Sequence, residues 1–267
     1  MEITKEIAIK VRDTVDAGLV RGKGIPIPGS MCVEAAVCFA MGLPHSDEPT
    51  CVSPAIRALK IRLNDSDWSS DSARAKGMRR LALVQLGSAG AVDDNDFARR
   101  IAEMTIRKIV PIALRAAAVL HPAAEHKTAL EVSAKLCELE GAGSAAWSAA
   151  RPAWSAAASA RSAESAWSAA RSAAESAWSA AESAWSAARS AGSAGSAAES
   201  AWSAARSAGS AARSAAESAR SAGSAGSAAE SAAVDTVLSG FAESVVQVLI
   251  EMKAPGCQWL DLVPISP

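Results

Sequence analysis

The stretch SAWSAARSAAESAWSAAESAWSAARS, residues 165–190, shows the pattern that dominates the chain from 144 to 233. Serine recurs in units of Ser-Ala-x or Ser-Ala-Ala-x, and the 23 serines from Ser155 to Ser231 have a mean spacing of about 3.45 residues. This period is close to the roughly 3.5 residues of a left-handed supercoil, and Ala, Arg and Glu are strong helix formers. We therefore predict a helical repeat, since a strand would need alternation with a period of two.

The x position of each unit carries the large side chains of the repeat. Six of these positions are tryptophan: Trp147, Trp154, Trp167, Trp178, Trp185 and Trp202. Their indole rings could fill space between helices, or form an exposed stripe that binds a protein, a sugar or bases. They could also belong to an ice-binding surface, which is the least favoured use because the repeat lacks the regular threonines of alanine-rich antifreeze helices.

Pairs of glycine divide the repeat. The string SAGSAGSAAESA begins at Ser190 and again at Ser221, and each copy places two glycines three residues apart. Because glycine costs about 1 kcal/mol in a helix interior, we expect the chain to turn or kink at Gly192/Gly195 and at Gly223/Gly226. The repeat is then expected to fold back as two or three antiparallel helices.

Composition argues against several functional classes. The chain has 267 residues, a formal net charge of −1 and 50% apolar residues, many of them alanine. Basic and acidic residues are balanced along the chain, so we expect no nucleic-acid partner. Apolar runs fall short of the roughly 20 residues of a membrane span, and the charged N-terminus does not read as a secretory signal. Five cysteines without CxxC spacing fit a reducing compartment, so the expected location is the cytoplasm.

Patterns typical of amphipathic helices precede the repeat. We predict helices over 3–17, 31–41, 55–65, 73–87, 96–120 and 126–141. Ser30 and Ser53 are expected to cap the second and third of these helices, with Pro54 in the first turn after Ser53. A cluster of capping residues, SDWSSDS at 66–72, precedes the fourth helix. Pro111 is expected to kink or restart the fifth helix.

An apolar seam after the repeat predicts a last helix over 233–253. The seam residues recur at spacings of three and four: Val234, Leu238, Phe241, Val245, Val248 and Met252. We expect this face to pack on the run 97–120 or on the helix 126–140. The predicted fold class is all-α: an N-terminal helical domain with a long Ala/Ser-rich repeat folded back as antiparallel helices, and a closing C-terminal helix. The expected parts are an N-terminal helical domain, connecting helices, the repeat, and a closing helix with its tail: 1–92, 93–143, 144–233 and 234–267.

Cys32 is the leading candidate for a catalytic residue. It follows the expected cap Ser30 by two residues, and the N-terminus of a helix lowers the pKa of a nearby thiol. His45 and Asp47 follow within the same segment, and the loop could bring His45 close to the thiol. The favoured interpretation is nevertheless that Cys32 is a small apolar core residue, which is the commonest role of a free cysteine.

Two groups of side chains have only part of a metal-binding pattern. One contains three cysteines and a histidine: Cys32, Cys38, Cys51 and His45. Its intervals miss the usual ligand spacing of zinc sites. The other resembles the opening of a calcium loop: Asp65, Asp67 and Ser69. It lacks glycine at the sixth position and has Lys76 where the bidentate glutamate belongs. We therefore expect no metal site and no cofactor.

Two pairs of motifs resemble sequences found in other proteins. MCVEAAVCFAMGLP (31–44) with RLNDSDWSS (62–70) and a following helix resembles small uncharacterised helical domains of bacteria and their phages. VLIEMKAPGCQWLDLV (248–263) with tracts such as AWSAARSAAES (166–176) is similar to other uncharacterised bacterial proteins, some of them labelled as immunity proteins. The resemblance covers about half of the chain and implies an all-helical fold, but no established activity or catalytic residue.

These patterns favour a non-enzymatic, cytoplasmic helical protein that uses its repeat for self-association or for binding a protein partner. A role in bacterial immunity or phage conflict is compatible with the resemblance. One alternative is a cysteine-dependent enzyme that uses Cys32 and His45. A second alternative is an ice-binding or other ligand-binding surface formed by the helical repeat.

Overall fold

The computed structural model describes residues 3–109, 111, 112, 115, 118, 124–139 and 227–265. Within these residues all regular secondary structure is helical, apart from one isolated antiparallel β-bridge between Gly24 and Met31. The predicted all-α class is thus confirmed for the described part of the chain. The repeat up to residue 226 lies outside the described residues, together with its six tryptophans, its expected turns and its expected antiparallel arrangement.

Four capped helices build the N-terminal half: α1 (Lys5–Asp16), α2 (Val33–Ala40), α3 (Pro54–Asn64) and α4 (Asp71–Val84). The hydroxyl of Ser53 accepts the amide of Ile56 at 3.4 Å, which confirms the predicted cap of α3 with Pro54 in its first turn. The helix α4 begins in the predicted capping cluster, where the Ser70 hydroxyl accepts the amide of Ala73 at 3.1 Å. Each cap satisfies an amide that the helix itself leaves unpaired.

The predicted cap of α2 was wrong, because Cys32 and not Ser30 occupies the N-cap position. The Cys32 sulfur accepts the amide of Ala35 at 3.4 Å. The chain is still extended at this point, since Met31 pairs with Gly24 and the Cys32 amide donates to the Lys23 carbonyl at 3.2 Å. A contact across the preceding loop therefore delays the start of the helix by two residues.

The helix α5 (Asp94–Met104) continues directly into a π-helix, η1 (Thr105–Ile109). Pro111, which follows this π-helical turn, has no backbone N–H and cannot continue a regular helical hydrogen-bond pattern. The wider helical turn thus lies shortly before the proline at which the sequence predicts a kink or a restart, and Pro111 and Ile112 are again α-helical.

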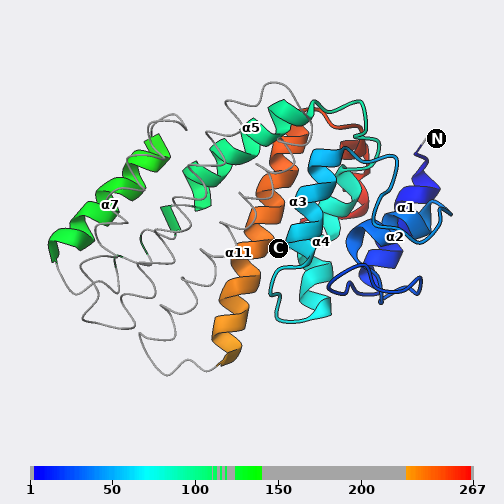
Figure 1. Cartoon of the computed structure of the whole chain (residues 1–267), viewed down its shortest axis with the longest axis horizontal. Helices are drawn as coiled ribbons and strands as arrows, with labels where there is room; N and C mark the ends of the chain where they lie inside the picture. The colour runs from blue at the N-terminus through cyan, green and yellow to red at the C-terminus, as the bar shows by residue number, and fades with distance from the viewer. Residues whose placement is uncertain are drawn as a thin grey trace.

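The helix α7 (Ala124–Leu139) packs against η1. Arg115 fixes this arrangement, because its guanidinium makes two hydrogen bonds to Glu138, at 2.6 and 2.9 Å, and lies 3.5 Å from Glu131. Both glutamates belong to α7, so two side chains of α7 hold the segment that follows the π-helix. Figure 1 shows α7 at one end of the molecule and α1 and α2 at the other.

The last long helix, α11 (Ser227–Glu251), is the central support of the fold. Four residues of the predicted seam are buried: Leu238, Phe241, Val245 and Val248. Met252, the last seam residue, is partly buried. The main partner of α11 is α4, a helix that the expected pairing did not include, and α5 is the second partner. Figure 1 shows α11 running alongside these helices. A short 3-10 helix, η3 (Pro255–Leu262), then covers α4.

Candidate functional site

Cys32, the leading catalytic candidate, is buried at the start of α2. Hydrogen bonds from the amides of Glu34 and Ala35 favour its thiolate, as expected at a helix N-terminus. Burial acts more strongly in the opposite direction, because it removes the thiolate from water, and the net result is a raised pKa for Cys32. The Asp47 carboxylate adds a small repulsion of the same sign.

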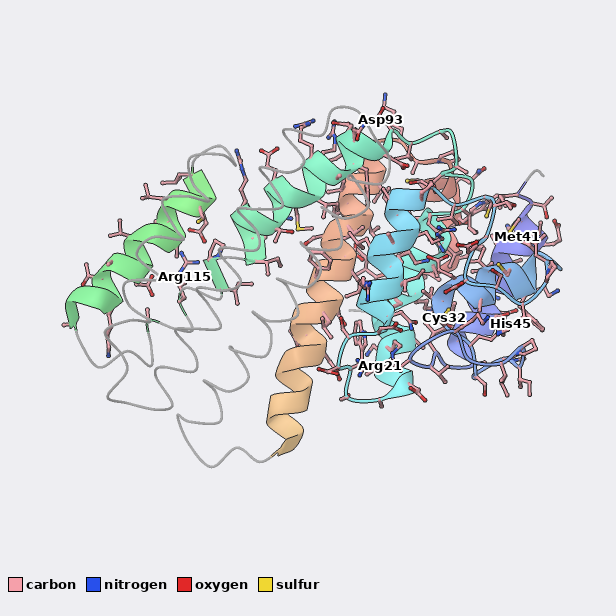
Figure 2. The ribbon with its side chains drawn as sticks, in the orientation of Figure 1. Arg21, Cys32, Met41, His45, Asp93 and Arg115 are labelled. Atoms are coloured by element: carbon pink, nitrogen blue, oxygen red, sulfur yellow. The ribbon has the colours of Figure 1, made fainter. Side chains whose placement is uncertain are left out.

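His45 is engaged with the backbone of the loop before α2. Its Nε2 lies 3.0 Å from the carbonyl oxygen of Gly24, while its Nδ1 is buried without a hydrogen-bond partner. Within the described part of the chain, no hydrogen bond joins His45 to Cys32. Figure 2 shows both residues at the α1–α2 end of the molecule. The structure therefore brings the two candidates to the same region without forming a nucleophile–base pair.

The neighbouring cysteines have the properties of core residues. Burial is the main cause that raises the pKa of Cys38, to about 11, and it also raises the pKa of Cys51. The Cys51 thiol donates to the sulfur of Met41 at 3.3 Å, a contact between two soft side chains. In the described ranges, no group of three or more His, Cys, Asp or Glu side chains is arranged to hold a metal ion.

Thiol labelling at neutral pH tests the reactivity of Cys32. We expect a maleimide to modify Cys257 first, because it is the one cysteine of the five that is not buried. Cys32 should react many times more slowly than it does in the denatured chain, and peptide mapping over time would measure both rates. Selective labelling of Cys32 that is lost in a His45→Ala variant would instead support the enzyme alternative.

The most unusual group in the described structure is a buried polar cluster formed by Glu34, Lys60 and Gln85. These residues come from α2, α3 and the C-cap of α4, and each side chain is 0% exposed. A fully buried lysine is rare in proteins, and it requires a partner when it is found. The helix α2 contacts both α3 and α4, so Glu34 lies where the three helices meet.

Geometry within this buried polar cluster is loose. Lys60 Nζ lies 3.4 Å from Glu34 Oε1, which is close enough for an ion pair, yet the angles do not make a hydrogen bond. The Gln85 carboxamide is one of the groups that lower the pKa of Glu34, although neither of its polar atoms makes a hydrogen bond of regular geometry. Burial raises the pKa of Glu34 and lowers the pKa of Lys60, and their mutual attraction opposes both shifts.

Sequence reasoning missed this cluster although a signal was present. Lys60 lies on the apolar face of α3, four residues after Ile56 and beside Leu59 and Leu63. The side chains of these three apolar residues are all buried. A charged residue at such a position is predicted to be buried and paired. Its partner is 26 positions away on another helix, which helical periodicity alone does not identify.

The RLNDSDWSS segment, which carries part of the resemblance, forms a structural junction. The Asn64 side chain accepts the Val33 amide at 3.3 Å and donates to the Val20 carbonyl at 2.9 Å. The buried Arg74 donates to the carbonyl oxygens of Asn64, at 2.7 Å, and of Leu19, at 2.9 Å. These bonds satisfy backbone groups of the segment after α1, at the start of α2 and at the end of α3.

The same segment also fastens α11. The Ser69 amide donates to an Asp235 carboxylate oxygen at 2.9 Å, and the Ser69 hydroxyl donates to the other oxygen. The buried Trp68 ring lies so close to Gly77 of α4 that a β-carbon at this glycine would come within 2.3 Å of the ring. Helix α11 is therefore held by its packing on α4 and α5 and by a polar contact near its N-terminal end.

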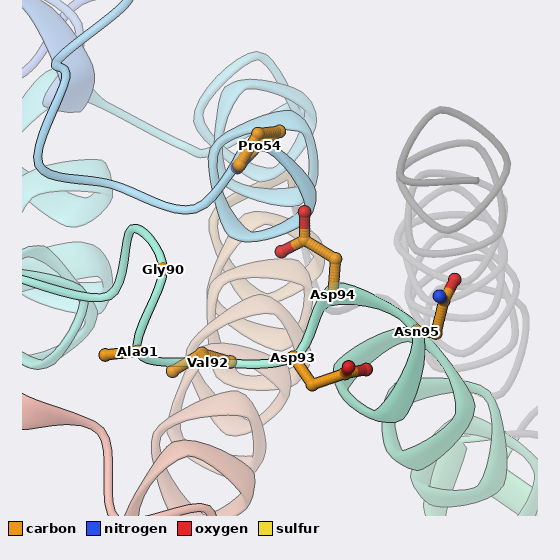
Figure 3. A pocket seen from close by; sticks show the side chains of 7 residues that line it. All are labelled: Pro54, Gly90, Ala91, Val92, Asp93, Asp94 and Asn95. Atoms are coloured by element: carbon orange, nitrogen blue, oxygen red, sulfur yellow. The ribbon is translucent and has the colours of Figure 1, made fainter. Parts of the chain in front are cut away.

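An open pocket of about 480 Å³ lies between the starts of α3 and α5. Figure 3 shows the loop 90–92 on one side and Pro54 on the other, with Asp93, Asp94 and Asn95 at its rim. Asp94 accepts a hydrogen bond from the Ser53 hydroxyl, and Asp93 accepts the amide of Asp96 at 2.7 Å. Both carboxylates are thus accounted for by the capping of the two helices.

Comparisons of the chain with protein-family models, with curated proteins and with solved structures find no match. None of the described helices is both long enough and apolar enough to span a lipid bilayer. The assignment of a function therefore depends on the residues and contacts described above.

Proposed function

We propose that the protein is a non-enzymatic helical protein that uses its Ala/Ser/Trp repeat to associate with itself or with a protein partner. The observation that carries this proposal is the course of α11. This helix begins at Ser227, inside the repeat, and continues without a break into the apolar seam that is buried against α4 and α5. The end of the repeat is thus part of the same helix that is anchored in the core.

Polar contacts support an anchored repeat at both ends. Near the start of α11, Asp235 holds the backbone and hydroxyl of Ser69. On the side where the chain enters the repeat, Arg115 is bound to Glu131 and Glu138 of α7. A repeat whose two ends are fixed on a helical domain loses less conformational freedom on binding than a free tail does, and this favours association.

The cysteine-dependent alternative has weaker support. The pKa of the Cys32 thiol is raised, and the candidate base His45 contacts a backbone carbonyl instead of the thiol. An activated nucleophile requires a lowered pKa or a base within hydrogen-bond reach. The binding interpretation agrees better with the indole rings that recur at the x position of the repeat unit, since tryptophan is enriched at the energetic centres of interfaces.

Replacing all six repeat tryptophans by alanine tests the proposed function. We expect the wild-type chain to form oligomers in light-scattering measurements, or to retain a protein partner, and the six-fold variant to lose this association at least tenfold. A matched control replaces Arg171, Arg189 and Arg206 of the same repeat by lysine and should associate normally. A monomeric wild-type chain whose partner capture survives deletion of the repeat would disprove the proposal.

A further inference from the structure

The loop between α3 and α4 holds the repeat side of α11 through Ser69. The Ser69 amide donates to Asp235 Oδ1 at 2.9 Å, and the Ser69 hydroxyl donates to Asp235 Oδ2, so one residue engages both oxygens of the carboxylate. Asp235 lies just after the repeat and just before the buried Leu238. The pair therefore connects the N-terminal helices to the part of α11 that leads into the repeat.

We propose that Ser69 is a phosphorylation site, and that its phosphate releases the start of α11 from this loop. A phosphoserine has no hydroxyl donor, and its phosphate carries a charge of about −1.5 to −2 at neutral pH. The Asp235 carboxylate would lose the hydrogen bond from the hydroxyl and would face a group of its own charge. A phosphate beside an acidic side chain disrupts a contact through this repulsion.

The modification balances with a nucleoside triphosphate as the co-reactant. Ser69 Oγ attacks the terminal phosphorus of the triphosphate, and the bond from this phosphorus to its bridging oxygen breaks. The leaving nucleoside diphosphate takes the electron pair of that bond, and the hydroxyl proton passes to the catalytic base of the kinase. The product is a phosphate monoester on Ser69, formed without oxidation or reduction.

The position of Ser69 suits a kinase that recognises acidic segments. Ser69 is exposed and lies outside the helices, whereas the preceding Trp68 is buried. Three aspartates lie close to it in the sequence and would attract a basic substrate groove: Asp65, Asp67 and Asp71. Because the hydroxyl is engaged with Asp235, the kinase acts when the start of α11 opens locally, and the ends of helices open at low free-energy cost.

The charged groups around Ser69 determine which helix the phosphate releases. Asp67 is paired with Arg21 at 3.1 Å, and Asp71 is paired with Arg74. In the part of the chain that the structure describes, no ion pair neutralises Asp235. A phosphate on Ser69 also lies next to the N-cap of α4, where the helix dipole favours negative charge. It is therefore tolerated at α4 and repelled at α11.

The consequence for the repeat rests on the proposed function. Release of the Ser69–Asp235 contact removes one of the two anchors of the repeat. A repeat that is less fixed must be ordered at a greater entropic cost when it binds. We therefore expect phosphorylation of Ser69 to weaken the association of the repeat.

Hydrogen exchange of the full-length chain with phosphoserine incorporated at position 69 tests the release. We expect the amides of residues 231–240 to exchange at least about tenfold faster than in the unmodified chain, while α4 keeps its protection. The matched control carries phosphoserine at position 72, since Ser72 is exposed in the first turn of α4, and it should leave α11 unchanged. Asp235→Asn in the chain with phosphoserine at 69 should restore most of the protection, because it removes the like charge.

Kinase treatment tests the site itself. A serine kinase that prefers acidic segments, supplied with ATP, should add a phosphate that peptide mapping places on Ser69 and that is lost in Ser69→Ala. Absence of phosphate from Ser69 would overturn the proposal. Unchanged exchange in α11, equal acceleration by phosphoserine at position 72, or no restoration by Asp235→Asn would overturn it as well.

Light scattering of the same samples, together with partner capture, separates this proposal from the proposed function. Faster exchange in α11 with neither self-association nor a partner for the unmodified chain would contradict the proposed function and leave the Ser69 site in place. Association that is equal with and without the phosphate, together with unchanged exchange, would contradict the role of Ser69 and leave the proposed function in place.

Discussion

A Phe241→Ala substitution is expected to lower the free energy of unfolding by about 3–5 kcal/mol, because it leaves a large cavity in the middle of the core. Phe241 is 0% exposed and belongs to the face of α11 that is buried in the fold. The measurement is the shift of the denaturant midpoint, followed by far-ultraviolet circular dichroism. Hydrogen exchange should also speed up along α11, since its docking on α4 and α5 would weaken.

The same helix provides a matched control for this prediction. Ile250 of α11 is 37% exposed, so Ile250→Ala removes side-chain volume of which a large part already faces solvent. We expect it to change the unfolding free energy by only about 1 kcal/mol or less. Equal losses in the two variants would show that α11 is not docked through its seam, and the anchored repeat in the proposed function would then lose its main support.

The seam of α11 could be predicted from the sequence because burial of a helix face leaves a local, periodic pattern. Leu238, Phe241 and Val245 follow this pattern and are buried. The partner could not be predicted in the same way, since several amphipathic helices of the chain offer a suitable face. What selects α4 is the close approach at Gly77, where a β-carbon would come within 2.8 Å of the Ser239 hydroxyl of α11, together with the ion pair between Arg80 of α4 and Glu243 of α11. These are long-range contacts, and helical periodicity carries no information about them.

The predicted N-caps of the helices were likewise correct only where no contact outside the helix competed with the local capping preference. Ser53 caps α3 as predicted, and α4 begins inside the predicted capping cluster 66–72, where Ser70 is the cap. At α2 the local capping preference of Ser30 is overridden by the bridge between Gly24 and Met31, which keeps the chain extended as far as Cys32. The candidate thiol consequently lies two positions earlier in the helix than expected, at the cap itself, and burial raises its pKa.

The buried polar cluster was the part of the candidate site least accessible to sequence reasoning. Lys60 stands on an apolar helix face, and this could have marked it as buried. Glu34 sits among small apolar residues in the first turn of α2, where an acidic residue is also explained by the helix dipole. No pattern in the sequence marks Gln85 as part of a buried cluster. Only the packing of α2 against both α3 and α4 brings the three side chains together.

A Lys60→Met substitution is expected to make the stability of the protein depend on pH in a defined direction. Lys60 is among the influences that lower the pKa of Glu34, so without it the carboxyl group should hold its proton even more strongly in the folded state. The unfolded chain releases this proton near the ordinary value of 4.5. Between these two values the folded state binds more protons than the unfolded state, so stability is complete below pH 4.5 and falls as the pH rises through the folded pKa.

The expected loss in Lys60→Met is about 3–5 kcal/mol at pH 8, where a deprotonated Glu34 would be left buried without a counter-charge. It should be markedly smaller at pH 5, where the carboxyl group can remain neutral in the core. Denaturant unfolding at both pH values, compared with Lys76→Met, separates this effect from the titration of surface groups, since Lys76 is exposed on α4. A loss of the same size at both pH values would mean that Glu34 is not the group left unpaired, because only an uncompensated buried carboxyl group becomes less unfavourable on protonation.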